Sequence, residues 1–249
     1  QRMYVWFDAL NIYQTGVGFG WDENLYNKWW PADVHVIGKG ISRFHAVYWP
    51  AFLLSAGLNL PKKIFAHEYF TVNGQKMSKT VGNVIDPFTL IKTYGADPLR
   101  YYFLAKFSPF SDGDFSEEEF KKTYNADLAN GLGNLVSRIA KMAEGIPVTS
   151  YVEPKIINTP LTGFGLWYQF DRTLKLIFEK IKACDVFIND KQLWKLTGEE
   201  KQKNIHYLID QIRIIEYALR PFLPQTAEKI LAQFSQSTIS SHPPLFPRI

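Results

Sequence analysis

The amino-acid sequence predicts an α/β part followed by an all-α part, with the change near residue 115. Before that point, short apolar runs alternate with glycine-containing turns around one longer apolar stretch, which is typical of βαβ units with a parallel sheet. Beyond it, apolar residues recur every three or four positions over long segments, the period of amphipathic helices. A chain of 249 residues is long enough for two modest domains, each with its own core.

The first part is expected to contain short strands and one helix. Residues 4–7 form an apolar run that predicts a strand already under way, and this abrupt start suggests a missing front. Residues 34–38 predict a buried strand closed by glycine, and residues 42–56 are long and apolar enough for a helix packed on it. Two further strands are predicted at residues 62–67 and 69–72.

A polar loop at residues 73–80 separates these strands from helical sequence. Residues 88–94 and 98–105 fit two short helices. Ser116, with Glu119 three positions later, forms a capping box that opens a long amphipathic helix. Gly145 is expected to end that helix, since glycine readily adopts the left-handed conformation found just after helix ends.

The rest of the chain reads as a helical bundle. Residues 147–165 contain proline, glycine and threonine without periodicity and are expected to be a linker. Helices are predicted at residues 167–188, 199–219 and 224–234, so that four amphipathic helices follow one another. The Ser/Thr/Pro-rich tail at residues 235–244 is expected to be extended.

Composition excludes several classes of protein. With 46% hydrophobic and 16% aromatic residues, the chain can offset its ordering entropy by burial, which excludes intrinsic disorder. The lone Cys184 excludes a disulfide framework and a cysteine-based zinc site, and favours a reducing, cytoplasmic compartment. Neither a signal peptide nor an apolar run long enough to span a membrane is present in this sequence. The formal charge of +4 permits a polyanionic partner without requiring one.

The segment Lys76-Met77-Ser78-Lys79-Thr80 places two lysines three positions apart in a loop between glycines. Lysine suits phosphate oxygens, and both hydroxyls can donate hydrogen bonds. On charge alone, an exposed hairpin with ordinary surface lysines is the better interpretation. The segment nevertheless resembles the KMSKS signature of class I aminoacyl-tRNA synthetases, with Thr80 in place of the final serine. The resemblance implies that Lys76 and Lys79 are catalytic, stabilising the ATP triphosphate while Met77, Ser78 and Thr80 complete the ATP-binding loop.

Neighbouring segments are similar to methionyl-tRNA synthetases in particular. The similarity covers residues 5–13, 37–51 and 67–102, and includes the end of the chain at residues 244–249. It implies a methionine side-chain pocket, which aromatic and histidine side chains suit because a thioether gains from sulfur–aromatic contacts. The residues implied are Trp6, Tyr13, Phe44, His45 and Trp49. From composition alone, they would instead be core aromatics and a satisfied buried histidine.

Gly38 and Lys39 follow a predicted strand and are expected to approach the nucleotide at the carboxyl edge of a parallel sheet. Two nearby positions depart from the family. Gly40 stands where the family usually has aspartate, which removes an acceptor for the adenosine ribose. Glu68 stands where glycine is usual, and its carboxylate would repel phosphate unless it points away or pairs with a lysine.

The resemblance also implies that the helical part binds the tRNA anticodon. Asn134 and Arg138 lie four positions apart on one helix face. With Asn189 and Trp194 they match the family positions that read the CAU anticodon. The amide would contact base edges, the guanidinium would stack or form bidentate hydrogen bonds, and the indole would stack on an unstacked base. The alternative is a solvated Asn/Arg pair and a tryptophan that caps the bundle core.

Together these features indicate the carboxyl-terminal half of a methionyl-tRNA synthetase. Residues 1–60 would be the rear half of a Rossmann-type nucleotide-binding domain, 61–115 the KMSKS loop with a linking α/β segment, and 116–249 the anticodon-binding domain. ATP with Mg, methionine and tRNA(Met) would be the substrates, with no zinc site. The chain alone is expected to be inactive because it contains no His-x-Gly-His motif, and the missing amino-terminal half is an expected partner. The alternatives are a non-catalytic tRNA-binding module and a synthetase for another amino acid.

Overall fold

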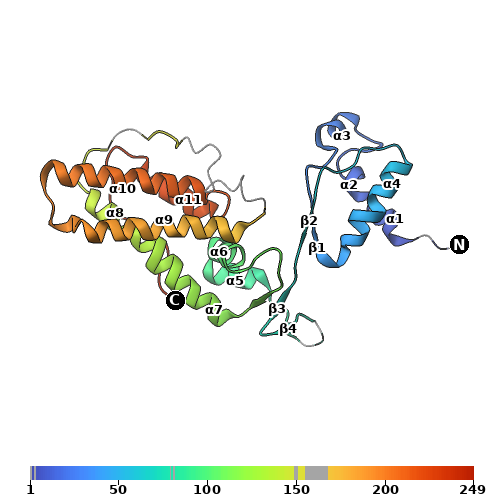
Figure 1. Cartoon of the computed structure of the whole chain (residues 1–249), viewed down its shortest axis with the longest axis horizontal. Helices are drawn as coiled ribbons and strands as arrows, with labels where there is room; N and C mark the ends of the chain where they lie inside the picture. Colours follow the sequence, from blue (N-terminus) through green and yellow to red (C-terminus); the bar gives the residue numbers. More distant parts are fainter. Residues whose placement is uncertain (1, 3, 79, 81, 149–150, 155–167) are drawn as a thin grey trace. The chain divides into compact units, whose positions relative to one another are not determined.

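A computed structural model describes the chain except for residues 1, 3, 79, 81, 149–150 and 155–167 (Figure 1). The described residues form two compact units. The first comprises residues 1–69 with 110–113, and the second comprises residues 70–109 with 114–249. The linking segment after residue 70 therefore packs with the helical bundle. The expected division into three functional domains, at residues 60 and 115, remains a prediction.

The first unit contains the parallel strand pair expected from the sequence. Strands β1 (His35–Gly38) and β2 (Ile64–His67) are parallel, with His35 opposite Ile64. Between them run a short 3-10 turn, η1 (Lys39–Ile41), a π-helical turn, η2 (Phe44–Tyr48), and helix α4 (Trp49–Ser55). The predicted strands at residues 34–38 and 62–67 and the predicted helix at residues 42–56 are therefore confirmed.

The predicted strand at residues 4–7 is wrong, because Val5–Ala9 forms helix α1. Val5 and Phe7 are exposed, whereas Trp6 packs on a core that contains the fully buried Leu10. Tyr13 and Val17 pack on the same core, so the inward positions recur every three or four residues. A run of four apolar residues was too short to reveal this helical period. Because residues 5–9 are helical, an abrupt first strand no longer supports the prediction of a missing amino-terminal part.

Two more helices complete this end of the first unit. Helices α2 (Ile12–Thr15) and α3 (Glu23–Trp29) were not predicted from the sequence. Asp22 caps α3 by accepting a hydrogen bond from the backbone N–H of Leu25 at 3.0 Å. The core of this unit gathers around the buried Trp30 and Trp49.

The second unit begins with a hairpin. Strands β3 (Phe70–Val72) and β4 (Gln75–Lys76) are antiparallel, and β5 (Gly113–Phe115) lies on the other side of β3. The strand predicted at residues 69–72 is confirmed, but the polar loop expected from residue 73 starts later. Asn73 and Gly74 have φ of 51° and 75°, the left-handed conformations of a type I′ turn, which pairs Gln75 and Lys76 with β3.

Helices follow as predicted. Helix α5 is Pro87–Tyr94 and α6 is Ala96–Lys106. The long helix consists of α7 (Glu117–Thr123), a π-helical stretch η3 (Tyr124–Gly133) and α8 (Asn134–Ala143), which follow one another directly. The Ser116 hydroxyl accepts from the backbone N–H of Glu119 at 3.5 Å, and Gly145 has φ of 76°, so the predicted start and stop are both confirmed.

Helices α9 (Phe170–Asp190), α10 (Gly198–Leu219) and α11 (Pro224–Phe234) complete the bundle with α8 (Figure 1). Their boundaries confirm the predicted helices, although Trp167 and most of the expected linker lie outside the described residues. Asp97 on α6 ties the linking segment to the bundle, because its buried carboxylate accepts from the backbone N–H of Thr226 at 2.6 Å. Among the described residues, no helix combines the length and apolar character needed to cross a membrane.

Candidate functional site

The five residues expected to form a methionine pocket lie together in the first unit. The rings of Trp6 and Phe44 stack with centroids 4.1 Å apart. The Tyr13 hydroxyl lies 2.8 Å from Nε2 of His45, and the Tyr13 ring lies 6.3 Å from that of Trp49. His45 and Trp49 are fully buried, whereas the other three rings are half-buried. Helices α1, α2 and α4 and the turn η2 thus bring one aromatic cluster together.

Hydrogen bonding assigns the proton positions in this cluster. Nδ1 of His45 lies 2.9 Å from the carbonyl oxygen of Ile41, which can only accept, so Nδ1 carries a proton. In the neutral imidazole Nε2 then accepts, and the Tyr13 hydroxyl donates to it. Because these two polar groups bind each other, the surface offered to a ligand is mainly aromatic ring.

His35 belongs to the same cluster and was missed from the sequence. It is buried at the start of β1, its ring lies 4.3 Å from that of Tyr13, and its Nε2 accepts from Nε1 of Trp49 at 3.3 Å. Burial, aided by the nearby His45, lowers the pKa of His35 below its ordinary value. The signal available in the sequence was a histidine inside the apolar run of residues 34–38.

Lys39, expected at the nucleotide, is held by two carboxylates. Its ammonium group contacts both oxygens of Asp112, at 2.7 and 2.9 Å, and also pairs with Glu68. The hydrogen bonds that the Lys39 ammonium group donates to Asp112 and Glu68 raise the pKa of Lys39, and Lys39 in turn lowers the pKa of Asp112. Because Glu68 pairs with Lys39, the repulsion expected between the Glu68 carboxylate and a phosphate is reduced. Asp112 was missed because it lies far from Lys39 in the sequence.

Gly40 is explained by the position of Tyr69. A Cβ atom added at Gly40 would collide with the Tyr69 hydroxyl. The Tyr69 ring also lies 5.2 Å from the Lys39 ammonium group, within range of a cation–π contact. This chain therefore fills with Tyr69 the space that a side chain at residue 40 would need.

In the lysine loop, Lys76 is exposed on β4 and Met77 is 39% exposed. Asn83, which was missed from the sequence, holds the loop: its Oδ1 accepts from the backbone N–H of Ser78 at 2.8 Å, and its Nδ2 donates to the carbonyl of Lys76 at 3.1 Å. The backbone N–H of Thr80 donates to the Ser78 hydroxyl at 3.2 Å. Lys79 lies outside the described residues.

The expected anticodon residues lie around helices α8 and α9. Nη1 of Arg138 donates to Asp185 at 2.7 Å, and Nη2 donates to Oδ1 of Asn189 at 2.8 Å. Asn134 is exposed one turn before Arg138. Asp185 was missed from the sequence. Burial raises the pKa of Asp185, an effect that the Arg138 guanidinium opposes.

Trp194 follows Asn189 on the 3-10 turn η5 (Leu193–Lys195). Its side chain is 56% exposed, so the alternative of a tryptophan that caps the bundle core is wrong. Leu193 is fully buried instead, and Gln192 has φ of 46°. A buried leucine anchors the turn and leaves the indole facing solvent.

Comparison with known proteins identifies the class of proteins to which the chain belongs. Residues 1–140 match a family model described as tRNA synthetases class I (M), and this range covers more than half of the chain. The lysine loop and the aromatic–histidine cluster both fall within it. The chain therefore belongs to the class I tRNA synthetases.

The relatives give the particular family. The methionine–tRNA ligase of Clostridium acetobutylicum is 41% identical over 253 residues, covering 94% of this chain and 39% of the relative. That of Thermotoga maritima is 38% identical, covering 94% and 40%. A structure of Mycobacterium tuberculosis methionyl-tRNA synthetase in complex with methionyl-adenylate is 34% identical with a TM-score of 0.82, covering 99% of this chain and 56% of that one. The chain belongs to the methionyl-tRNA synthetase family and spans about two fifths of the length of these two ligases.

Proposed function

We propose that this chain contributes to a methionine–tRNA ligase, supplying the lysine loop, much of the methionine pocket and the anticodon-binding bundle. In the first step, a carboxylate oxygen of methionine attacks the α-phosphorus of ATP. The bond from that phosphorus to the bridging oxygen breaks, and Mg-bound pyrophosphate leaves. A hydroxyl at the tRNA 3′ end then attacks the methionyl carbonyl, and AMP leaves as the ester forms. Methionine, ATP with Mg, and tRNA(Met) are thus substrates.

The lysine loop has the character that phosphoryl transfer requires. Catalysis of such a step depends on in-line positioning and on stabilising charge on the phosphate oxygens. Lys76 is exposed, and among the residues that the structure describes it forms no ion pair that would neutralise it. Asn83 fixes the backbone on both sides of Met77, so Lys76 and Ser78 are presented from a defined turn. Lys79 is proposed to act beside Lys76.

The aromatic cluster supports selection of methionine by shape and polarisability. A thioether gains from contact with ring edges, and the stacked Trp6 and Phe44 and the half-buried Tyr13 offer such edges. The hydrogen bond between Tyr13 and His45 removes the polar groups that would otherwise have to be desolvated when an apolar side chain enters. A hydrophobic pocket of this kind discriminates by about 1–3 kcal/mol per methylene.

The observation that carries the RNA part of the proposal is the arrangement of Arg138, Asn189 and Trp194. Arg138 donates one N–H of Nη1 to Asp185 and one N–H of Nη2 to Asn189. Its guanidinium has further N–H groups that can donate to base edges. Trp194 exposes an indole on which an unstacked base can lie. Asn134 offers an amide one helical turn away.

One observation favours a second candidate, a non-catalytic tRNA-binding module. Lys39, expected at the nucleotide, is fully engaged by Asp112 and Glu68. A nucleotide phosphate would have to compete with two carboxylates for this lysine. In this candidate the bundle still reads the anticodon, and adenylate formation is lost from any assembly that includes the chain.

Both candidates require anticodon reading, which fluorescence anisotropy with labelled stem-loop RNAs tests. The 249-residue chain should bind a stem-loop with the anticodon CAU more tightly than the same stem-loop with GAA. A correctly read base contributes about 1–3 kcal/mol of discrimination, or roughly 5- to 150-fold. Equal affinity for the two stem-loops would overturn the RNA part of the proposal.

A further inference from the structure

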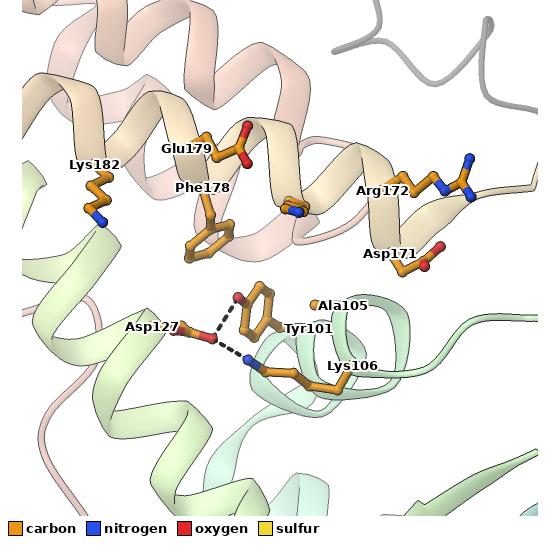
Figure 2. A pocket seen from close by; sticks show the side chains of 10 residues that line it. Tyr101, Ala105, Lys106, Asp127, Asp171, Arg172, Phe178, Glu179 and Lys182 are labelled. Atoms are coloured by element: carbon orange, nitrogen blue, oxygen red, sulfur yellow. Dashed lines mark hydrogen bonds and ion pairs between the residues drawn. The ribbon is translucent and has the colours of Figure 1, made fainter.

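The second unit contains a cavity of about 540 Å³. Its lining includes none of the proposed anticodon residues Asn134, Arg138, Asn189 and Trp194, and it has no role in the function proposed above. Helices α6 and α9 and the π-helical stretch η3 contribute its walls (Figure 2). Tyr101 and Phe178 form an aromatic floor, with ring centroids 4.6 Å apart. The polar lining residues are Lys106, Asp127, Asp171, Arg172, Lys175, Glu179 and Lys182. The cavity thus has charged walls around a small aromatic floor.

Pairing inside the cavity leaves cations available. The carboxylate of Asp127 accepts from the Tyr101 hydroxyl and pairs with Lys106, both at 2.9 Å, so this acid is already neutralised (Figure 2). Glu179 points away from Tyr101 and Asp127 in the same view. Among the described residues, Arg172, Lys175 and Lys182 form no ion pair, and Asp171 and Glu179 are the two lining acids that remain, which leaves one positive charge in excess. The wall formed by α9 therefore has an excess of unpaired positive charge.

This cationic wall continues the helix face that carries the Arg138 partners. Positions 175, 178, 182, 185 and 189 of α9 are separated by three or four residues, so they form one stripe along the helix. Lys175 and Lys182 line the cavity, and Asp185 and Asn189 on the same stripe hold Arg138. At 1.5 Å per residue, Lys175 lies about 21 Å along the axis from Asn189, a span of several nucleotides.

We propose that this cavity binds the phosphodiester backbone of the same RNA whose bases Arg138 and Trp194 read. Lysines at phosphates supply affinity and fix register, whereas groups at base edges supply sequence preference. The stripe divides these roles along α9, with backbone contacts at Lys175 and Lys182 and base contacts beyond Asn189. In this proposal the part of the RNA at the cavity is the double-stranded stem that leads to the anticodon loop. This inference rests on the proposed function.

The test compares three variants of the 249-residue chain by anisotropy at several salt concentrations, with the CAU and GAA stem-loops as probes. Lys175→Gln with Lys182→Gln removes the proposed contacts. Lys203→Gln with Lys229→Gln removes the same charge from exposed positions on α10 and α11 that do not line the cavity. Lys175→Arg with Lys182→Arg keeps the charge and separates loss of contact from loss of folding, which circular dichroism monitors.

The expected result is a uniform loss. Each phosphate contact changes the slope of log K against log salt by about 0.7–0.9, which corresponds to roughly 5- to 8-fold in affinity near 0.1 M salt. The cavity double variant should therefore bind both stem-loops about 30-fold more weakly, with a shallower salt dependence. The arginine variant should bind like the parent, and the control should lose clearly less than the cavity variant.

Three results would overturn the inference, and they are distinguishable. If the parent prefers CAU but the cavity variant keeps the affinity and salt slope of the control, the cavity takes no backbone and the proposed function stands. A loss confined to the CAU stem-loop would likewise exclude a backbone role. If the parent binds CAU and GAA equally, the proposed anticodon function itself fails and this inference fails with it.

Discussion

Replacing Asp185 with asparagine should weaken anticodon discrimination without weakening the fold. Asp185 holds Nη1 of Arg138 at 2.7 Å, while Asn189 holds Nη2 at 2.8 Å, so the guanidinium is fixed from two sides. Both side chains of the ion pair are mostly buried, with 30% of Arg138 and 23% of Asp185 exposed. Asparagine keeps the shape and one acceptor but removes the charge that orients the guanidinium.

The affinity change follows from the type of hydrogen bond that is lost. A hydrogen bond to a charged group contributes about 1.5–3 kcal/mol and a neutral one about 0.5–1.5 kcal/mol. The substitution should therefore cost about 1 kcal/mol of positioning, which is roughly fivefold in the ratio of CAU to GAA affinity. Because removing a carboxylate also favours any polyanion, the ratio of affinities isolates positioning from general charge.

The melting temperature should not fall when Asp185 is replaced with asparagine. Burial raises the pKa of Asp185 above its ordinary value of 3.8, and this effect outweighs the attraction of Arg138. A carboxyl group whose pKa is higher in the folded state stabilises the fold most at low pH, and this contribution is lost as pH rises through the raised pKa. At pH 7 the ionised Asp185 is thus a net cost to folding, and Asp185→Asn should melt at the same temperature as the parent or higher.

Anisotropy with the two stem-loops and thermal melting followed by circular dichroism check these expectations together. Asp190→Asn is the matched control, since it removes one exposed carboxylate from the same end of α9 and should leave the affinity ratio unchanged. An unchanged ratio in Asp185→Asn would refute the positioning role. A lower ratio together with a lower melting temperature would show that Asp185 acts through folding and would refute the reasoning equally.

Three further predictions concern exposed and buried rings. Trp194→Ala should bind the CAU stem-loop about 5- to 150-fold more weakly, since stacking on one ring contributes about 1–3 kcal/mol, and its circular dichroism should match the parent because the indole is exposed. Tyr13→Phe leaves Nε2 of His45 buried without a donor and should lower the free energy of unfolding of the first unit by about 1–3 kcal/mol in urea titrations, with Tyr4→Phe as an exposed control. Because burial lowers the pKa of His35 below 6.5, the stability it contributes is present above pH 6.5 and is lost as pH falls through the lowered pKa. Melting temperatures between pH 7.5 and pH 5 should fall more steeply for the parent than for His35→Gln, and parallel curves would contradict this.

Local signals predicted most of the helical part correctly. The boundaries of α10 and α11 follow from apolar spacing and from Pro224, and the hydroxyl of Ser116 caps the long helix as its sequence pattern indicates. These features depend on residues a few positions apart, which the sequence displays directly. The failure at residues 4–7 has the same origin, because a window of four apolar residues cannot distinguish period 2 from period 3.6.

The sequence predicted candidate site residues that belong to a family motif, and it missed residues whose partner lies far away in the sequence. Trp6, Tyr13, Phe44, His45 and Trp49 were identified from the family resemblance, and the structure brings them together. Asp112 and Asp185, the partners of Lys39 and Arg138, carry no local pattern in the sequence. Asp112 meets Lys39 only through the tertiary fold, and Asp185 lies 47 residues from Arg138.

Methionine-dependent exchange of pyrophosphate into ATP tests the central claim most directly. The part of the Clostridium acetobutylicum ligase that precedes the region of similarity would be fused ahead of this chain, with the parent ligase as the positive control. The fused protein should exchange pyrophosphate with methionine but not with leucine or isoleucine, and Lys76→Ala should abolish most of that exchange, whereas the exposed Lys203→Ala should not. A folded fusion that shows no methionine-dependent exchange, or one that exchanges equally well with leucine, would contradict a methionine–tRNA ligase.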